Sequence, residues 1–102
     1  MILVNKLIEV LKKNKIEFFT GVPDSILKNF SLYLEKLPKQ MHVIATNEGL
    51  ATSLGIGYYL STKKIPCIYL QNSGLSNAIN PLISIANKAV YSIPLFLMIG
   101  WR

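Results

Sequence analysis

The chain has little of several residue types, and each shortage removes a class of protein. Its 102 residues contain one cysteine and one histidine, so we expect neither an internal disulfide nor a metal site built from such ligands. No apolar run approaches the ~20 residues that a membrane-spanning helix requires. The N-terminus lacks the continuous apolar block of a signal peptide, which favours a cytoplasmic location.

Acidic residues are also scarce, because five of them stand against eleven basic residues and leave a net charge of +6. Most of the lysines are spread over the first 40 residues without a contiguous basic run, and aromatic residues do not alternate with them. We therefore interpret them as solvated helical faces rather than a nucleic-acid-binding surface. A hydrophobic fraction of 51% is typical of a small, buried α/β core.

Hydrophobic periodicity predicts four helices alternating with four strands. The expected helices cover about residues 3–14, the apolar stripe Leu27, Phe30, Leu34 and Leu37, residues 47–60 and residues 75–87; the expected strands cover residues 16–20, 42–45, 66–70 and 93–99. Asn80-Pro81 marks either the start of the last helix or a kink in it. This alternation predicts a parallel sheet with helices on both faces, a three-layer α/β/α fold.

Polar loops follow all four predicted strands. They are Gly21–Ser25, Thr46–Gly49, Gln71–Asn77 and Gly100–Arg102. The carboxyl ends of parallel strands meet at one edge of the sheet, and open α/β sheets bind their ligands at that edge. We therefore expect the functional site to be built from these four loops.

Glu48 is the most informative residue in these loops, because it joins an apolar strand to a helix that carries no further charge. A carboxylate in apolar surroundings has its ionised form disfavoured, so such a group can share or donate a proton near neutrality. On position alone, a structural role is favoured. Thr46 or Asn47 would cap the helix, and Glu48 would complement its dipole.

Two further loops offer polar groups. Asp24 lies on a turn shaped by Gly21 and Pro23, and its simplest interpretation is the cap of the next helix. The loop Gln71–Asn77 places amides and hydroxyls at a helix start, where a polar or anionic ligand could bind. It lacks the Gly-Lys-Ser/Thr of a P-loop and the glycines of a dinucleotide-binding turn.

Four sequence blocks, in the same order and spacing, resemble thiamine-diphosphate-dependent decarboxylases of the phosphonopyruvate decarboxylase type. The blocks are residues 19–25 (FTGVPDS), 44–49 (IATNEG), 69–82 (YLQNSGL with Asn77 and the Asn80-Pro81-Leu82 run) and 91–102 (YSIP leading into IGWR). The α subunit of sulfopyruvate decarboxylase is similar over the same blocks. The match runs from about Phe18 to Arg102, with Ser76 standing where this family has glycine.

The resemblance implies a role for each matching residue. Glu48 would bond a ring nitrogen of the thiamine diphosphate pyrimidine and share its proton. Asp24 would assist proton transfer at the reacting carbon. The remaining implied site residues are Asn72, Ser73, Gly74 and Asn77 at the cofactor, and Ser25 and Arg102 at the substrate.

The resemblance also implies that residues 1–102 are the N-terminal part of a pyrimidine-binding domain. The Gly-Asp-Gly motif that binds Mg²⁺ and the diphosphate in this family does not occur in the sequence, so a diphosphate-binding domain is absent from these residues. We expect it from a further domain, a homo-oligomer or a complementary subunit.

Three functions remain open. The first implied function converts 3-phosphonopyruvate to phosphonoacetaldehyde and CO₂. The second is a sulfopyruvate decarboxylase α-type subunit that requires a separate β subunit. The third is a non-catalytic module that binds a small ligand or a protein.

The last predicted strand raises the question of self-association. Residues 94–100 are apolar on both faces, as in a strand central to a parallel sheet. Without a neighbouring strand they would form an exposed edge that pairs with another chain. We therefore expect the isolated chain to self-associate or to need a partner, and to bind thiamine diphosphate weakly or not at all.

Overall fold

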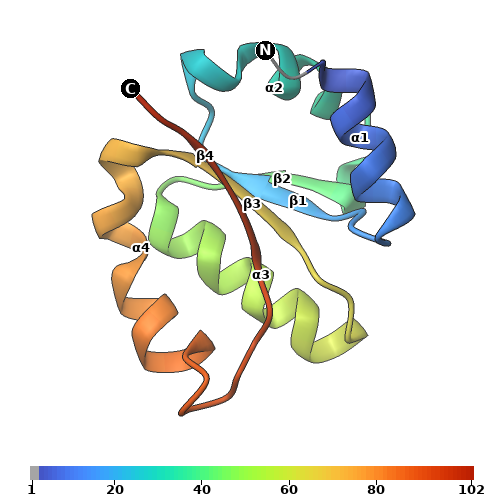
Figure 1. The fold of residues 1–102 in the computed structure, drawn as a ribbon. Coiled ribbons are helices and arrows are strands. Elements are labelled where there is room, and N and C mark those ends of the chain that lie inside the picture. The colour runs from blue at the N-terminus through green and yellow to red at the C-terminus, as the bar shows by residue number, and fades with distance from the viewer. Residues whose placement is uncertain (1–2) are drawn as a thin grey trace.

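The computed structural model describes residues 3–102, and its centre is a parallel four-stranded sheet between two layers of helices (Figure 1). The strands are β1 (Phe19–Gly21), β2 (His42–Ile44), β3 (Cys67–Gln71) and β4 (Phe96–Gly100). The helices are α1 (Val4–Lys13), α2 (Lys28–Leu34), α3 (Glu48–Thr62) and α4 (Leu75–Pro81). The predicted α/β class and parallel sheet are confirmed.

The strand order is β2-β1-β3-β4, and every pair is parallel. After β1 the chain adds β2 on one side, and it then crosses to add β3 and β4 on the other side. The strand order therefore reverses between β1 and β3. In open α/β sheets such a switch point leaves a crevice outside the carboxyl ends of the two strands, and ligands bind there.

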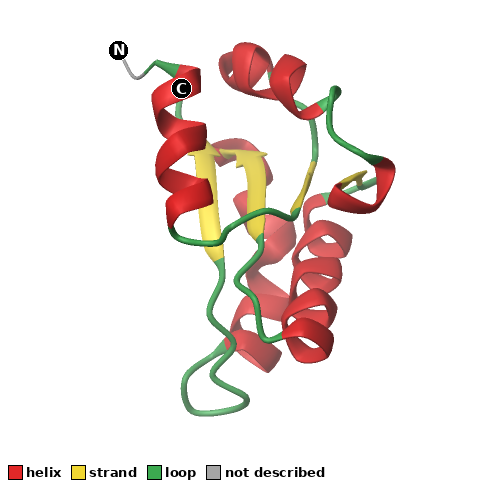
Figure 2. Ribbon diagram, turned by 90° about the vertical axis from the view of Figure 1, so that its right-hand side faces the viewer, coloured by secondary structure: helices red, strands yellow, loops and turns green. Residues whose placement is uncertain are grey.

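Alternate residues of β3 point to opposite helix layers. Cys67 and Tyr69 belong to the core under α1 and α2, whereas Ile68 and Leu70 belong to the core over α3 and α4. All four are at most 1% exposed. Figure 1 shows the two helix pairs on opposite faces of the sheet, and the view at right angles shows the strands enclosed by helices (Figure 2).

Two strands begin later than predicted, because buried side chains precede the residues whose backbones pair with a neighbouring strand. Ile16 was predicted as the first residue of its strand, but it is buried beside α1, and β1 begins only at Phe19. Lys15, with a φ of 60°, turns the chain just before Ile16. The last strand, predicted from Ile93, begins at Phe96. In both cases the apolar pattern indicates burial, and the buried residues extend beyond those that pair in the sheet.

Pro81 produces a change of helix type. Helix α4 begins at Leu75, and the segment Leu82–Ala86 continues it as a π-helix. Proline has no N–H and its ring crowds the preceding turn, so the regular hydrogen-bond pattern fails at this point. Asn80-Pro81 therefore lies within the helix, and the prediction that it marks the helix start is wrong.

Within residues 3–102, no helix combines the length and the apolar character needed to cross a membrane.

Candidate functional site

Glu48 is the first residue of α3, and the residue before it forms the helix cap. The side-chain oxygen of Asn47 accepts a hydrogen bond of 2.8 Å from the backbone N–H of Leu50. Asn47 therefore meets the capping requirement, which Thr46 or Asn47 was predicted to fill. The Glu48 side chain is not needed for this purpose and faces the loop after β3.

The carboxylate of Glu48 lies between two residues that follow β3. Asn77 Nδ2 donates a hydrogen bond of 2.9 Å to Glu48 Oε1. On the other side, Glu48 Oε2 lies so close to Gly74 that a Cβ on residue 74 would overlap it. The structure thus brings together Glu48, Gly74 and Asn77, three of the residues predicted to bind the cofactor.

The surroundings of Glu48 differ from the expectation in one respect. The side chain is only partly buried, and its carboxylate contacts the amide of Asn77 and the backbone of Gly74. Glu48 is thus less enclosed than a fully buried carboxylate, and its role in proton sharing stays a prediction.

Asp24 is at the capping position of the short 3-10 turn Ser25–Leu27, but its side chain makes no capping hydrogen bond. The residue is 8% exposed, and neither carboxylate oxygen has a hydrogen-bond partner within residues 3–102. Oδ2 lies against the Cα of Gly100, at the end of β4. A buried carboxylate without a partner is costly. The interpretation of Asp24 as a side-chain cap was therefore wrong, although its backbone occupies that position.

Ser25, Asn72 and Arg102 form a second group of candidate residues at the same edge of the sheet. The guanidinium of Arg102 donates to Ser25 Oγ, and the backbone N–H of Arg102 donates to Asn72 Oδ1 at 3.2 Å. The loops after β1, β3 and β4 are joined in this way. Asn72 was predicted at the cofactor, yet its side-chain oxygen is engaged by Arg102. Ser73, also predicted at the cofactor, is exposed.

Sequence reasoning did not identify a hydrogen bond that spans three strands beneath the site. Tyr69 Oη and His42 Nε2 are 2.6 Å apart, although β1 separates β3 from β2. The Tyr69 ring reaches across because Gly21, on β1, has no side chain; a Cβ there would overlap the ring. No sequence pattern predicts this contact, because a glycine at position 21 is explained equally well by the turn that follows.

Burial shifts the titration of this pair and of the nearby thiol. It lowers the pKa of His42 below 6.5, although a backbone hydrogen bond at Leu34 and the Glu35 carboxylate act in the opposite direction. Burial also raises the pKa of Tyr69 to about 12, assisted by Cys67 and Glu35, and that of Cys67 to about 12. The phenol and the thiol are therefore protonated at neutral pH.

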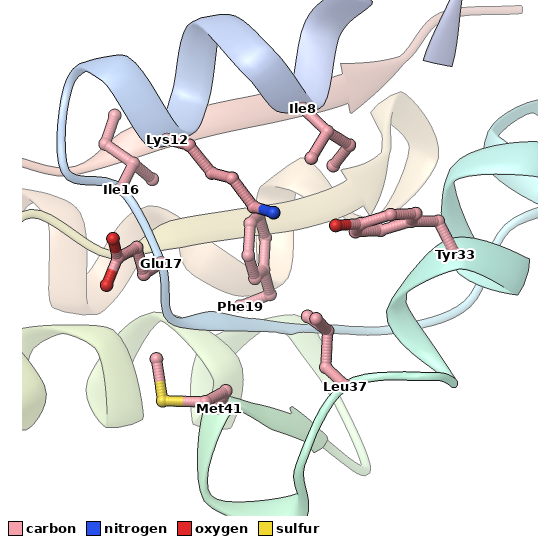
Figure 3. A pocket seen from close by; sticks show the side chains of 8 residues that line it. All are labelled: Ile8, Lys12, Ile16, Glu17, Phe19, Tyr33, Leu37 and Met41. Carbon is pink, nitrogen blue, oxygen red and sulfur yellow. The ribbon is translucent and has the colours of Figure 1, made fainter. Parts of the chain in front are cut away.

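The hollow in Figure 3 lies away from these residues. It has a volume of about 140 Å³ and lies between α1, α2 and the starts of β1 and β2. Its lining is mainly apolar and includes Ile8, Phe19 and Leu37. None of the predicted site residues lines it. Within residues 3–102, no group of three or more His, Cys, Asp or Glu side chains could hold a metal ion.

The chain is similar in sequence to proteins that are named decarboxylases. The chain is 36% identical over 92 residues to the sulfopyruvate decarboxylase subunit alpha of Methanocaldococcus jannaschii, covering 90% of this chain and 53% of that one. It is 34% identical over 82 residues to the phosphonopyruvate decarboxylase of Streptomyces viridochromogenes, covering 80% of this chain and 20% of that one. The chain thus spans about half, or less, of the curated relatives that it matches.

Solved structures share the fold. The benzoylformate decarboxylase of Polynucleobacter necessarius superposes with a TM-score of 0.77 at 24% identity, over 98% of this chain and 18% of that one. A candidate thiamin diphosphate-dependent enzyme of Mycobacterium smegmatis gives a TM-score of 0.74 at 25% identity, over 91% of this chain and 17% of that one.

A family model described as "Thiamine pyrophosphate enzyme, N-terminal TPP binding domain" matches residues 1–102. Thiamine pyrophosphate is another name for thiamine diphosphate. The chain therefore belongs to the family of N-terminal TPP binding domains of thiamine pyrophosphate enzymes.

Proposed function

We propose that this chain forms the pyrimidine-binding part of a thiamine-diphosphate-dependent decarboxylase that acts on a 2-oxo acid with a second strongly acidic group. The observation that carries the proposal is the Glu48 carboxylate held between Asn77 and Gly74 at the carboxyl edge of the sheet. Membership of the family supports it, as do the names of the relatives, which are decarboxylases.

The Glu48 site fits the aminopyrimidine ring of the cofactor. A carboxylate accepts hydrogen bonds at both oxygens, and Asn77 occupies only one direction at Oε1. Glu48 would hold a proton at the ring nitrogen opposite the amino group and exchange it during turnover. When bound, thiamine diphosphate supplies a carbon nucleophile and an electron sink for the electrons released as CO₂ leaves. Gly74 leaves the space that the Glu48 carboxylate occupies, because a Cβ on residue 74 would overlap Oε2.

Asp24 would act on the substrate side of the site. Its carboxylate is buried and unpartnered within residues 3–102 and lies at the end of β4. Such a group can take up or release a proton where charge develops, and it is kept at the cost of stability. We assign it to proton transfer at the reacting carbon.

Arg102 and Ser25 would bind the second acidic group of the substrate. A guanidinium presents several N–H donors in a plane that matches sulfonate, phosphonate and carboxylate oxygens. Sulfopyruvate and phosphonopyruvate both carry such a group beside the 2-oxo acid. We place sulfopyruvate first, because three relatives bear the name of its decarboxylase α subunit, and phosphonopyruvate second.

The diphosphate and Mg²⁺ would be held outside these residues. The relatives named subunit alpha indicate an assembly with at least one other kind of subunit. A complementary subunit, or a domain that follows in a longer chain, would supply the ligands for the diphosphate and its metal ion.

A comparison of substrates tests the proposal in the assembled enzyme that contains this chain. Sulfopyruvate, phosphonopyruvate and benzoylformate are compared by CO₂ release with thiamine diphosphate and Mg²⁺ present. We expect turnover of at least one of the first two and little turnover of the third. Arg102→Gln should raise KM for the acidic substrates by about 10-fold or more, with a smaller effect on pyruvate.

Faster turnover of benzoylformate than of both acidic substrates would contradict the proposed substrate class. An Arg102→Gln enzyme with unchanged KM for the acidic substrates would remove Arg102 from substrate binding while leaving the cofactor assignment intact.

A further inference from the structure

The side chain of Asn72 joins the carboxyl ends of β3 and β4 beyond the point where the two strands pair. Gln71 and Gly100 are the last paired residues of these strands. Asn72 begins the 3-10 turn after β3, and its backbone carbonyl accepts a hydrogen bond from the N–H of Leu75. The carbonyl is therefore engaged in the turn. The side-chain oxygen Oδ1 instead accepts a hydrogen bond of 3.2 Å from the backbone N–H of Arg102.

This bond keeps the register of the sheet. Arg102 follows Asn72 by 30 positions. The same offset separates Phe96 from Pro66, whose backbone N–H and carbonyl bond where the ladder begins. Because the bonds of a parallel pair recur at every second residue of a strand, the N–H of Arg102 is in register for the carbonyl of residue 72. The side chain of Asn72 therefore takes the place of its own backbone carbonyl.

An asparagine at position 72 suits this contact. Its amide oxygen lies close to the main chain and accepts hydrogen bonds, as asparagine does where it replaces backbone groups in turns. Glycine or an apolar residue would leave the N–H of Arg102 without this acceptor. The contact fixes the backbone of Arg102, and the guanidinium donates to Ser25 Oγ on the loop after β1. Arg102 is thus held at both its backbone and its side chain.

We propose that Asn72 is a positioning residue, which holds Arg102 where it meets the second acidic group of the substrate and does not itself bind the cofactor. This role rests on the proposed binding of that group by Arg102 and Ser25. Ordering a long side chain costs entropy, and a substrate that meets an arginine already held in place avoids part of that cost. Hydrogen bonds between a guanidinium and an anion are also directional, so displacement of the Arg102 backbone weakens them.

Steady-state kinetics of the assembled enzyme tests this role. The substrate is sulfopyruvate or phosphonopyruvate, whichever the enzyme turns over. Asn72→Ala removes one hydrogen bond, so KM should rise by about 5-fold. The turnover number and the dissociation constant of thiamine diphosphate should stay within about 2-fold of the wild type. Ser76→Ala is the matched control, because Ser76 is an exposed polar residue a few positions further along the same segment. Its KM should equal that of the wild type.

A second background shows whether Asn72 acts through the guanidinium. Arg102→Gln keeps the backbone N–H, and with it the bond to Asn72, but removes the group proposed to bind the acidic substrate. Asn72→Ala should therefore raise KM only in the enzyme that retains Arg102, and the double variant should match Arg102→Gln. A residue that contacts the cofactor would instead lower cofactor affinity in both backgrounds when it is replaced.

Hydrogen exchange of the Arg102 amide in the assembled enzyme, measured by mass spectrometry at residue resolution, reports this bond without any substrate. Because Asn72→Ala removes the acceptor, exchange should quicken by about 5-fold or more. Ser76→Ala should leave the exchange rate unchanged. An unchanged rate in Asn72→Ala would overturn the proposed positioning, whatever the kinetics.

The kinetics separate this role from the proposed function. If Arg102→Gln raises KM and Asn72→Ala does not, Arg102 binds the substrate and the positioning role of Asn72 is wrong. If neither variant changes KM, the substrate role of Arg102 is wrong, and the role of Asn72 falls with it. A weaker affinity for thiamine diphosphate in Asn72→Ala would assign Asn72 to the cofactor and would also overturn the proposal.

Discussion

Asn77 Nδ2 donates a hydrogen bond of 2.9 Å to Glu48 Oε1, and this bond joins the first turn of α3 to the middle of α4. The amide fixes one carboxylate oxygen and leaves the other over Gly74. The bond therefore fixes the orientation of the Glu48 carboxylate.

Replacing Asn77 tests this orientation. Asn77→Ala removes a hydrogen bond to a carboxylate, a loss of about 1.5–3 kcal/mol, so the turnover number of the assembled enzyme should fall by about 10- to 100-fold. Asn80→Ala, also exposed on α4, should leave turnover within about 2-fold of the wild type. Equal losses in the two variants would show that a general effect on α4, rather than the contact with Glu48, is responsible.

Asp24→Asn should separate stability from activity. Asparagine replaces a buried carboxylate that has no hydrogen-bond partner within residues 3–102, so the free energy of unfolding at pH 7 should rise by about 1 kcal/mol or more. Turnover should fall at the same time, because asparagine cannot transfer the proton. Urea unfolding of the chain and steady-state kinetics of the assembled enzyme measure the two effects. A variant with unchanged turnover would leave Asp24 with a structural role only.

Acid should weaken the fold through His42, the chain's only histidine. In the unfolded chain the imidazole is protonated near its ordinary pKa of 6.5, whereas burial holds its pKa lower in the folded protein. Below pH 6.5 the unfolded state therefore binds more protons. The free energy of unfolding should fall as the pH drops from about 6.5 toward the folded pKa, and this contribution should be complete above pH 6.5.

Two variants test this contribution by urea unfolding between about pH 5 and about pH 8, a range that spans the ordinary pKa of histidine. His42→Gln should remove the slope just below pH 6.5. Tyr69→Phe deletes the hydroxyl that lies 2.6 Å from His42 Nε2 and should cost about 1 kcal/mol at neutral pH. A wild-type slope that persists in His42→Gln would assign the pH dependence to carboxylates instead.

The layered fold and the edge that carries the site follow from the sequence, because both depend on patterns that the chain displays locally. Alternation of apolar strands with helices predicts a parallel sheet, and loop polarity predicts which edge binds ligands. The resemblance then selected Glu48, Gly74 and Asn77, which the structure brings into contact. Glu48 lies 26 and 29 positions before Gly74 and Asn77, and the parallel topology places the segments after β2 and β3 at the same edge of the sheet.

The features that sequence reasoning missed depend on three-dimensional packing. The Tyr69 ring passes over Gly21 to His42 because three strands lie in a register that no local pattern encodes. Burial of Asp24 arises from the end of β4, more than 70 residues away. The partial exposure of Glu48 was missed for the converse reason, since uncharged neighbours in sequence need not cover a side chain in space.

Glu48→Gln tests the central claim most directly, through exchange of the C2 proton of thiamine diphosphate bound to the assembled enzyme. Glutamine keeps the shape and the contact with Asn77 but cannot share a proton. We predict that exchange slows by about 10²–10⁴-fold or more, with the melting temperature and bound cofactor unchanged. Exchange at the wild-type rate in a folded, cofactor-loaded variant would contradict the proposed role of Glu48.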